Sequence, residues 1–117
     1  MFKVIFYKTE TGREPAKEFI DSVRLRKGKD AEINIEKNDF YIEILSNFGL
    51  SSGLPYIKHL IDEIWELRPL KNRIFFGVWH NGLFVLLHGF TKKTRRTPKA
   101  ELEKALREYE DFKRRNS

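Results

Sequence analysis

The stretch that decides the fold runs from Ile61 to Pro98 and reads IDEIWELRPLKNRIFFGVWHNGLFVLLHGFTKKTRRTP. Apolar residues alternate with others in three segments, which predicts consecutive strands at 61–68, 73–80 and 83–90. A basic run closes the stretch and extends one residue beyond it, with five cations and no acid: Lys92, Lys93, Arg95, Arg96 and Lys99. We expect the chemistry of the protein where the strand ends meet this basic run.

The flanking segments predict one more strand and three helices. Residues 2–7 alternate like a strand. Pro15 suits the first turn of a helix that Gly28 ends, and Asp30 suits the cap of a second helix that ends at Gly49. Thr97-Pro98 is typical of the start of a closing helix. The predicted class is therefore α+β, in the order strand, helix, helix, three strands, helix. We expect a mainly antiparallel sheet of about four strands, with the first two helices as a hairpin on one side.

Length and composition indicate one domain over residues 1–117. The chain is 40% hydrophobic and 34% charged, as in globular proteins. It has no cysteine and its three histidines are scattered, so we expect no metal site and no cofactor. No apolar run is long enough for a membrane span, and we expect a cytoplasmic protein. The net charge is +6, concentrated in the last quarter of the chain, which favours polyanionic partners.

The two predicted turns set which side chains share a face of the sheet. A two-residue turn at Asn81-Gly82 pairs Trp79 with Phe84, Phe75 with His88 and Arg73 with Phe90. It leaves an apolar second face that carries Ile74, Phe76, Val78, Val85, Leu87 and Gly89. A turn over residues 69–72 places Glu66 opposite Phe75 and Arg68 opposite Arg73. Glu66, Arg68, Arg73 and His88 are therefore expected on one face, beside the start of the basic run.

Two arginines opposite each other repel unless an anion or an acid lies between them. The guanidinium group binds phosphate through two parallel hydrogen bonds, so we expect Arg68 and Arg73 to hold a phosphate, with Lys92 and Lys93 close by. Glu66 is open to two interpretations, a general base or a group that orients an arginine.

Further candidates lie around that phosphate site. Arg95, Arg96 and Lys99 are expected to contact RNA. His88 is either a core residue or an additional RNA contact. The aromatic residues of the predicted strands are interpreted as core rather than as a base-stacking surface.

Several motifs along the chain resemble one toxin family. The succession is Lys58-His59-Leu60, Trp65-Glu66-Leu67-Arg68, Arg73-Ile74 and His88-Gly89-Phe90-Thr91-Lys92-Lys93-Thr94 before Thr97-Pro98. It is similar to the phage-associated branch of HigB-type toxins, within the RelE/ParE superfamily, and the similarity covers most of the chain.

This resemblance implies a RelE-like fold and a ribosome-dependent mRNA endonuclease that inhibits translation without a metal. It implies neutralisation by a HigA-type helix-turn-helix antitoxin, with operator DNA contacted only through that complex. By position it assigns catalysis to Glu66, Arg68, Arg73, Lys92 and Lys93. Two alternatives remain open: a ParE-like gyrase poison of the same fold, and a non-catalytic regulator that binds nucleic acid.

Overall fold

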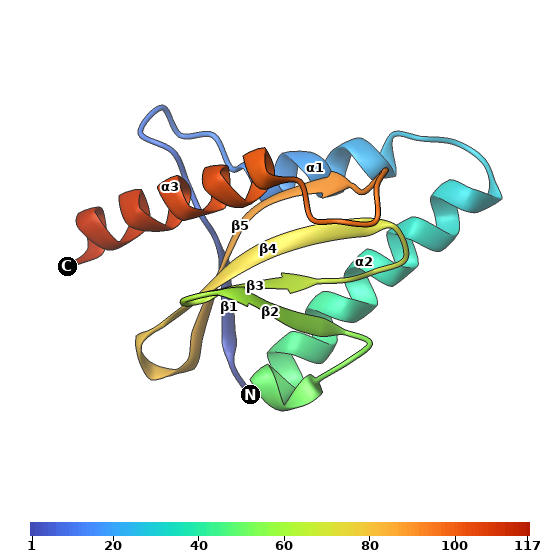
Figure 1. Ribbon diagram of the computed structural model, residues 1–117. Helices are drawn as coiled ribbons and strands as arrows, with labels where there is room; N and C mark the ends of the chain where they lie inside the picture. The colour runs from blue at the N-terminus through green and yellow to red at the C-terminus, as the bar shows by residue number, and fades with distance from the viewer.

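A five-stranded sheet in the order β1-β5-β4-β3-β2 forms the middle layer of the molecule (Figure 1). The structure is a computed structural model that describes the backbone of residues 1–117 and every side chain except that of Asn81. β1 runs parallel to β5, and the other neighbours are antiparallel. The strands are β1 (Lys3–Phe6), β2 (Ile57–Ile61), β3 (Ile64–Leu67), β4 (Asn72–Trp79) and β5 (Leu83–Thr91). The predicted α+β class is confirmed, although the sheet has five strands rather than about four.

Helices cover both faces of this sheet. α1 (Pro15–Arg24) and α2 (Lys29–Phe48) pack on one face, and α3 (Lys99–Asn116) crosses the opposite face (Figure 1). Short 3-10 turns span Gly49–Ser52 and His80–Gly82. The core under α1 and α2 contains Ala16, Ile20, Leu45, Ile74, Phe76 and Leu86. The core under α3 contains Phe75, Val85, Leu87, Ala105, Tyr109 and Phe112.

Glycines bring one helix on each face close to the sheet. A Cβ atom at Gly77 would lie 2.4 Å from the Tyr109 ring of α3, and one at Gly89 would lie 2.5 Å from the Phe19 ring of α1. These isolated glycines therefore serve close packing of aromatic rings against strands.

The helix starts differ from the predictions by one or two residues. α2 begins at Lys29, before the predicted cap Asp30, and α3 begins at Lys99, after the predicted first residue Pro98. Neither helix has a side-chain cap among the described residues. No helix in the described chain combines the length and apolar character that a membrane crossing requires.

The predicted strand at 61–68 is in fact the second half of a hairpin. β2 pairs with β3, and Ile61 lies opposite Ile64 across a turn at Asp62-Glu63. Asp62 has a φ of +49°, a left-handed conformation that aspartate tolerates better than most residues. The apolar alternation continues through the turn, which is why the sequence pattern did not separate the two strands.

The β4–β5 hairpin contains two departures from the predicted register, and they cancel. Its turn has three residues, so Trp79 pairs with Leu83 and Val78 with Phe84, one position away from the prediction. A bulge between Phe75 and Phe76 then absorbs one residue of β5. Beyond the bulge, Phe75 lies opposite His88 and Arg73 opposite Phe90, as predicted. The shift at the three-residue turn also puts Val85 and Leu87 in the core under α3, rather than on the face predicted for them.

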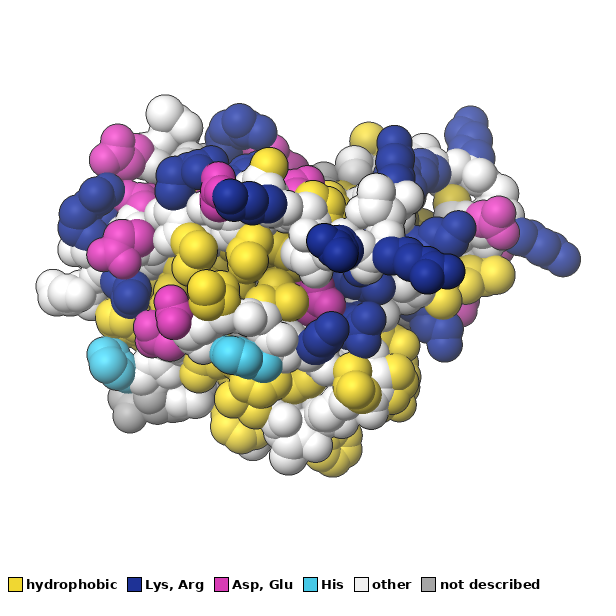
Figure 2. Space-filling model, viewed as in Figure 1, with side chains coloured by type: hydrophobic (Ala, Val, Ile, Leu, Met, Phe, Trp, Pro, Cys, Tyr) yellow, Lys and Arg dark blue, Asp and Glu magenta, His cyan; other side chains and the backbone are white. Residues whose placement is uncertain are grey.

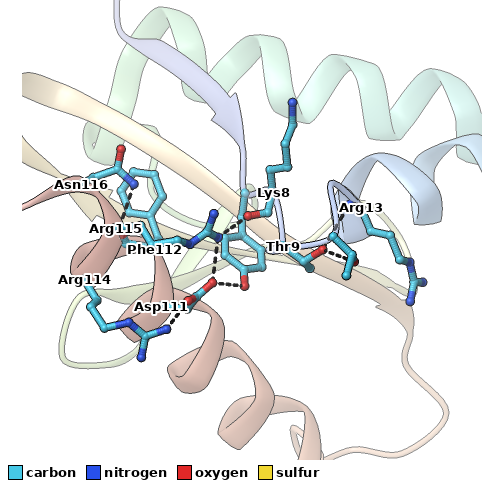
Figure 3. Close-up of polar contacts among 10 residues, drawn as sticks. Lys8, Thr9, Arg13, Asp111, Phe112, Arg114, Arg115 and Asn116 are labelled. Atoms are coloured by element: carbon cyan, nitrogen blue, oxygen red, sulfur yellow. Dashed lines mark hydrogen bonds and ion pairs between the residues drawn. The ribbon is translucent and has the colours of Figure 1, made fainter.

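A C-terminal latch ties the end of α3 to the end of β1 (Figure 3). Asp111 accepts hydrogen bonds from the Tyr7 hydroxyl at 2.7 Å, from Arg115 at 2.7 Å and from Arg114 at 2.5 Å. Arg115 also donates to the backbone carbonyl of Lys8. Residues more than 100 positions apart are thereby held together, which fixes α3 across the sheet.

Candidate active site

A buried carboxylate lies between two arginines where β3 ends and β4 begins. Glu66 is only 1% exposed, and its Oε2 atom lies 3.2 Å from Arg68 Nε and 3.7 Å from Arg73 Nε. The strand register explains this contact: Glu66 pairs with Phe75, and Arg73 lies two positions before Phe75 on the same face of β4. The structure thus brings together three of the predicted site residues. Glu66 Oε1 is buried without a hydrogen-bond partner among the described residues.

Burial and charge oppose each other in this cluster. Burial raises the pKa of Glu66 above its usual range, although Arg73 and then Arg68 pull it downward. Burial also lowers the pKa of Arg73, against the pull of Glu66. The pKa of Lys92 is lowered by desolvation and then by the nearby Arg73. The Glu66 carboxylate therefore takes up a proton more readily than a glutamate in water, and the Lys92 ammonium releases one more readily than a lysine in water.

A cationic hollow of about 700 Å³ opens beside this cluster. The β3–β4 turn and the start of the basic run form its walls, and Figure 2 shows Lys and Arg side chains gathered over this part of the molecule. Arg73 is anchored at its rim because Nη1 donates to the carbonyls of Leu70 at 2.9 Å and Asn72 at 2.7 Å. The lining residues are Leu70, Lys71, Arg73, Thr91, Lys92, Lys93, Thr94 and Arg95. Five of these are cations and none is an acid, so the hollow suits a phosphate group.

An asparagine network holds the rim of the hollow to α2. The Asn72 amide donates to Asn34 at 3.0 Å and to Asn38 at 3.1 Å, and its oxygen accepts a bond of 3.0 Å from the Thr91 hydroxyl. Asn72 and Asn38 are 1% and 0% exposed. The network fixes the start of β4 and the end of β5, the two points from which Arg73 and Lys92 project. Asn38 Nδ2 is buried without an acceptor among the described residues.

The structure corrects the predicted RNA contact of His88. This side chain is 2% exposed, lies under α3 and stacks near Phe75 and Phe90. Its Nδ1 lies 2.5 Å from Glu108 Oε1, and its Nε2 lies 3.2 Å from Glu101 Oε1. A residue enclosed in this way is part of the core, so the core interpretation of His88 is the one that its position supports.

The remaining cations of the basic run lie outside the hollow or at its edge. Lys93 and Arg95 line it and are exposed. Arg96 and Lys99 are exposed beyond its lining, and Lys99 lies 3.8 Å from Glu103. The predicted RNA contacts of these residues stay predictions.

Comparison with known proteins places the chain in a family. Residues 30–110 match the family model described as phage-derived protein Gp49-like (DUF891). The chain belongs to the Gp49-like family. This is a family of RelE- and HigB-like toxins, and the observed order of helices and strands fits the RelE-like fold. No curated protein matches the chain.

The part matched to the Gp49-like family contains the whole candidate site. It runs from the start of α2 through the hairpins and the basic run into α3. α1 and all residues of the C-terminal latch lie outside the match. The assignment to this family therefore rests on the segment that carries Glu66, Arg73 and Lys92.

Three contributors to the candidate site were not predicted as site residues from the sequence. Lys71 and Thr91 line the hollow, but Lys71 was predicted only as part of a turn and Thr91 appeared only within a motif of the resemblance. Lys58 lies directly opposite Glu66 on β2, a pairing invisible while β2 itself was not predicted. Lys71 could have been found from the sequence, because it lies in the turn between the strand that carries Glu66 and the strand that carries Arg73.

Proposed function

We propose that this protein is the toxin of a type II toxin–antitoxin system, acting as a ribosome-dependent mRNA endonuclease that inhibits translation. The observation that carries the proposal is the buried Glu66 beside Arg68 and Arg73 at a hollow lined by five cations. Membership of the Gp49-like toxin family supports the same reaction class.

The reaction that fits these groups is attack of a ribose 2′-hydroxyl on the adjacent phosphate. Glu66 takes the proton of the 2′-hydroxyl through Oε1, which has no other partner among the described residues. The O2′–P bond forms, the P–O5′ bond breaks, and Lys92 gives a proton to the departing O5′. The products are a 2′,3′-cyclic phosphate and a free 5′-hydroxyl. Because Glu66 is buried, the Arg68 side chain must move aside for Oε1 to be reached, while Arg73 stays anchored at the rim.

Arginine and lysine supply the electrostatic part of this mechanism. Arg68 and Arg73 stabilise the negative charge that develops on the phosphorane, and Lys93 adds to it at the rim. The positive lining also repels a divalent metal ion, so we propose a metal-independent reaction. The exposed Arg95, Arg96 and Lys99 are proposed to contact the RNA backbone.

A HigA-type helix-turn-helix antitoxin is the proposed partner that neutralises the protein. In this proposal mRNA is bound on the ribosome, and operator DNA is reached only through the antitoxin complex. The cationic hollow favours an antitoxin segment that carries acidic side chains to it.

The proposal is tested by inducing the protein in growing cells and mapping mRNA 5′ ends. A parallel reaction in vitro uses purified protein and mRNA with and without purified ribosomes. We expect growth arrest and cleavage within translated codons. Arg73→Ala should reduce cleavage by about 10²- to 10³-fold, because the charge on the phosphorane loses a positioned donor. Arg13→Ala, which removes an exposed arginine paired with Glu18, is the matched control and should leave cleavage unchanged.

The outcomes separate the competing functions. An SOS response without mRNA cleavage would assign the protein to gyrase poisoning. Growth arrest that persists in Arg73→Ala, with the fold intact by circular dichroism, would refute the assigned site.

A further inference from the structure

A second hollow lies directly beside the cationic one and has different chemistry. This amide hollow, of about 450 Å³, is lined by Arg26, Asp30, Asn34 and Asn72. It shares Leu70, Lys71 and Thr91 with the cationic hollow, so the two spaces are contiguous across the β3–β4 turn. Its volume lies in the roughly 300–1,000 Å³ range of small-molecule sites.

The lining of the amide hollow carries both an acid and bases, whereas every charged residue of the cationic hollow is a cation. Asp30 adds a carboxylate, which repels phosphate and accepts hydrogen bonds from amino groups. The Asn34 amide donates to the Asp30 carbonyl at 2.7 Å and accepts from Asn72, so its second N–H is the donor that it adds, and Arg26 adds a guanidinium group. Asp30 and Arg26 are exposed, and neither forms an ion pair within the described side chains. The set matches the edge of a nucleobase better than it matches a phosphate or a metal ion.

The wall between the two hollows is rigid and presents an apolar side chain. Leu70 has a φ of +58°, a conformation that costs a leucine backbone energy, and its carbonyl is held by Arg73 Nη1. Its side chain is 46% exposed. Behind it, Asn72 is fixed by Asn34, Asn38 and Thr91. Strain of this kind accumulates at ligand sites, and an exposed leucine offers a surface for a flat base.

We propose that the amide hollow is a nucleobase subsite that receives the base of a nucleotide next to the phosphate in the cationic hollow. One ribose joins a base to its phosphate, and the two hollows adjoin at a shared wall that includes Leu70 and Lys71, so a single nucleotide can place its phosphate in one and its base in the other. Asp30 accepts from an exocyclic amino group, which gives the subsite its preference among bases. The inference rests on the proposed function, because it takes the phosphate to be bound by Arg73 and Lys92.

The test uses the full chain, labelled with ¹⁵N, and four dinucleotide probes that lack the 2′-hydroxyl and cannot be cleaved. One probe carries both bases, two lack the base on one side of the phosphate, and one lacks both bases. We expect the side-chain amide signals of Asn34 and Asn72 to shift with the first probe and with one of the single-base probes. The signal of Asn47, exposed at the far end of α2, is the internal control and should stay in place.

A variant gives a quantitative second arm. Asp30→Ala should reduce the affinity advantage of the two-base probe over the baseless probe by about five- to tenfold, since one acceptor for the base edge is lost. Asp30 forms no ion pair within the described side chains, so the fold should not depend on it. Glu36→Ala, an exposed acid on the same helix, is the matched control and should leave the ratio unchanged.

The two proposals fail in different ways. If all four probes shift the backbone signals of Lys92 and Lys93 but none shifts Asn34 or Asn72, the base subsite is refuted and the phosphate site stands. If no probe shifts Lys92 or Lys93, the phosphate site of the proposed function is refuted as well.

Discussion

At the scale of single residues, the site depends on how one carboxylate is kept out of water. Glu66 is almost wholly buried, and burial outweighs the attraction of two arginines in setting its pKa. A glutamate with a raised pKa is a stronger base than an exposed one, and a lysine with a lowered pKa is a stronger acid. Both shifts move these groups toward neutral pH, where proton transfer is most effective.

The pH dependence of cleavage follows from these two directions. The rate should rise with pH as Glu66 deprotonates, at a pH above the usual glutamate range, and fall as Lys92 deprotonates, below the usual lysine range. Glu66→Gln should remove the rising limb and lower the rate by about 10²- to 10⁴-fold. Lys92→Arg should move the falling limb to higher pH, because arginine stays protonated. Single-turnover cleavage rates across pH measure both limbs.

One result would decide between the two roles considered for Glu66. If Glu66→Gln keeps the wild-type rate and the rising limb, the carboxylate only orients the arginines and another group accepts the proton. Glu63→Gln, at an exposed acid in the β2–β3 turn, is the matched control.

At the scale of elements, the docking of α3 sets the position of the basic run. The run connects the end of β5 to the start of α3, so both of its ends depend on how α3 lies on the sheet. Ala105, Tyr109 and Phe112 of α3 are buried against the sheet and form the apolar part of this docking. His88 adds a polar anchor because both ring nitrogens face carboxylates of this helix.

Removing one carboxylate of this anchor should weaken the fold. Glu108→Ala leaves His88 Nδ1 buried without its partner, and we expect a loss of about 1–3 kcal/mol in the free energy of unfolding. Glu103→Ala, on the exposed side of α3, should change it by less than about 0.5 kcal/mol. Urea unfolding followed by circular dichroism measures both. Equal losses in the two variants would show that the anchor contributes nothing.

At the scale of the whole molecule, the C-terminal latch makes the free energy of unfolding depend on pH in both the acidic and the alkaline range. The Tyr7 hydroxyl, and then Arg115, hold the pKa of Asp111 below its usual value, so the stabilisation is present at neutral pH and lost as pH falls through that lowered pKa. Burial, and then Asp111, raise the pKa of Tyr7 from 10.0 to about 12. Its contribution is therefore complete below pH 10 and is lost as pH rises toward 12.

Two substitutions should separate the acidic dependence, which comes from Asp111, from the alkaline dependence, which comes from Tyr7. Asp111→Asn should unfold at lower temperature than wild type at pH 7, with the difference shrinking in acid. Tyr7→Phe should be less sensitive than wild type to alkaline pH, since phenylalanine has no proton to lose. Melting temperatures from pH 2 to pH 11 measure both trends. A wild type and an Asp111→Asn variant that differ equally at every pH would contradict a titrating latch.

The sequence by itself determined most of the elements, but not the face of the sheet on which Val85 and Leu87 lie. Periodicity located three helices and the β4–β5 hairpin, and charge pattern located the basic run, because both signals are local. It also predicted Arg73 opposite Phe90, although through a register that is wrong at the turn. The β2–β3 hairpin was missed because its turn at Asp62 keeps the apolar alternation.

Only the tertiary structure decided the bulge, the burial of His88, the asparagine network and the pKa directions of Glu66 and Lys92. Each of these arises from contacts between segments far apart in the chain, such as Asn34 with Asn72. The opening stretch from Ile61 to Pro98 does supply most of the site. The amide hollow beside it is lined in part by α2, and only tertiary packing brings that helix to the β3–β4 turn.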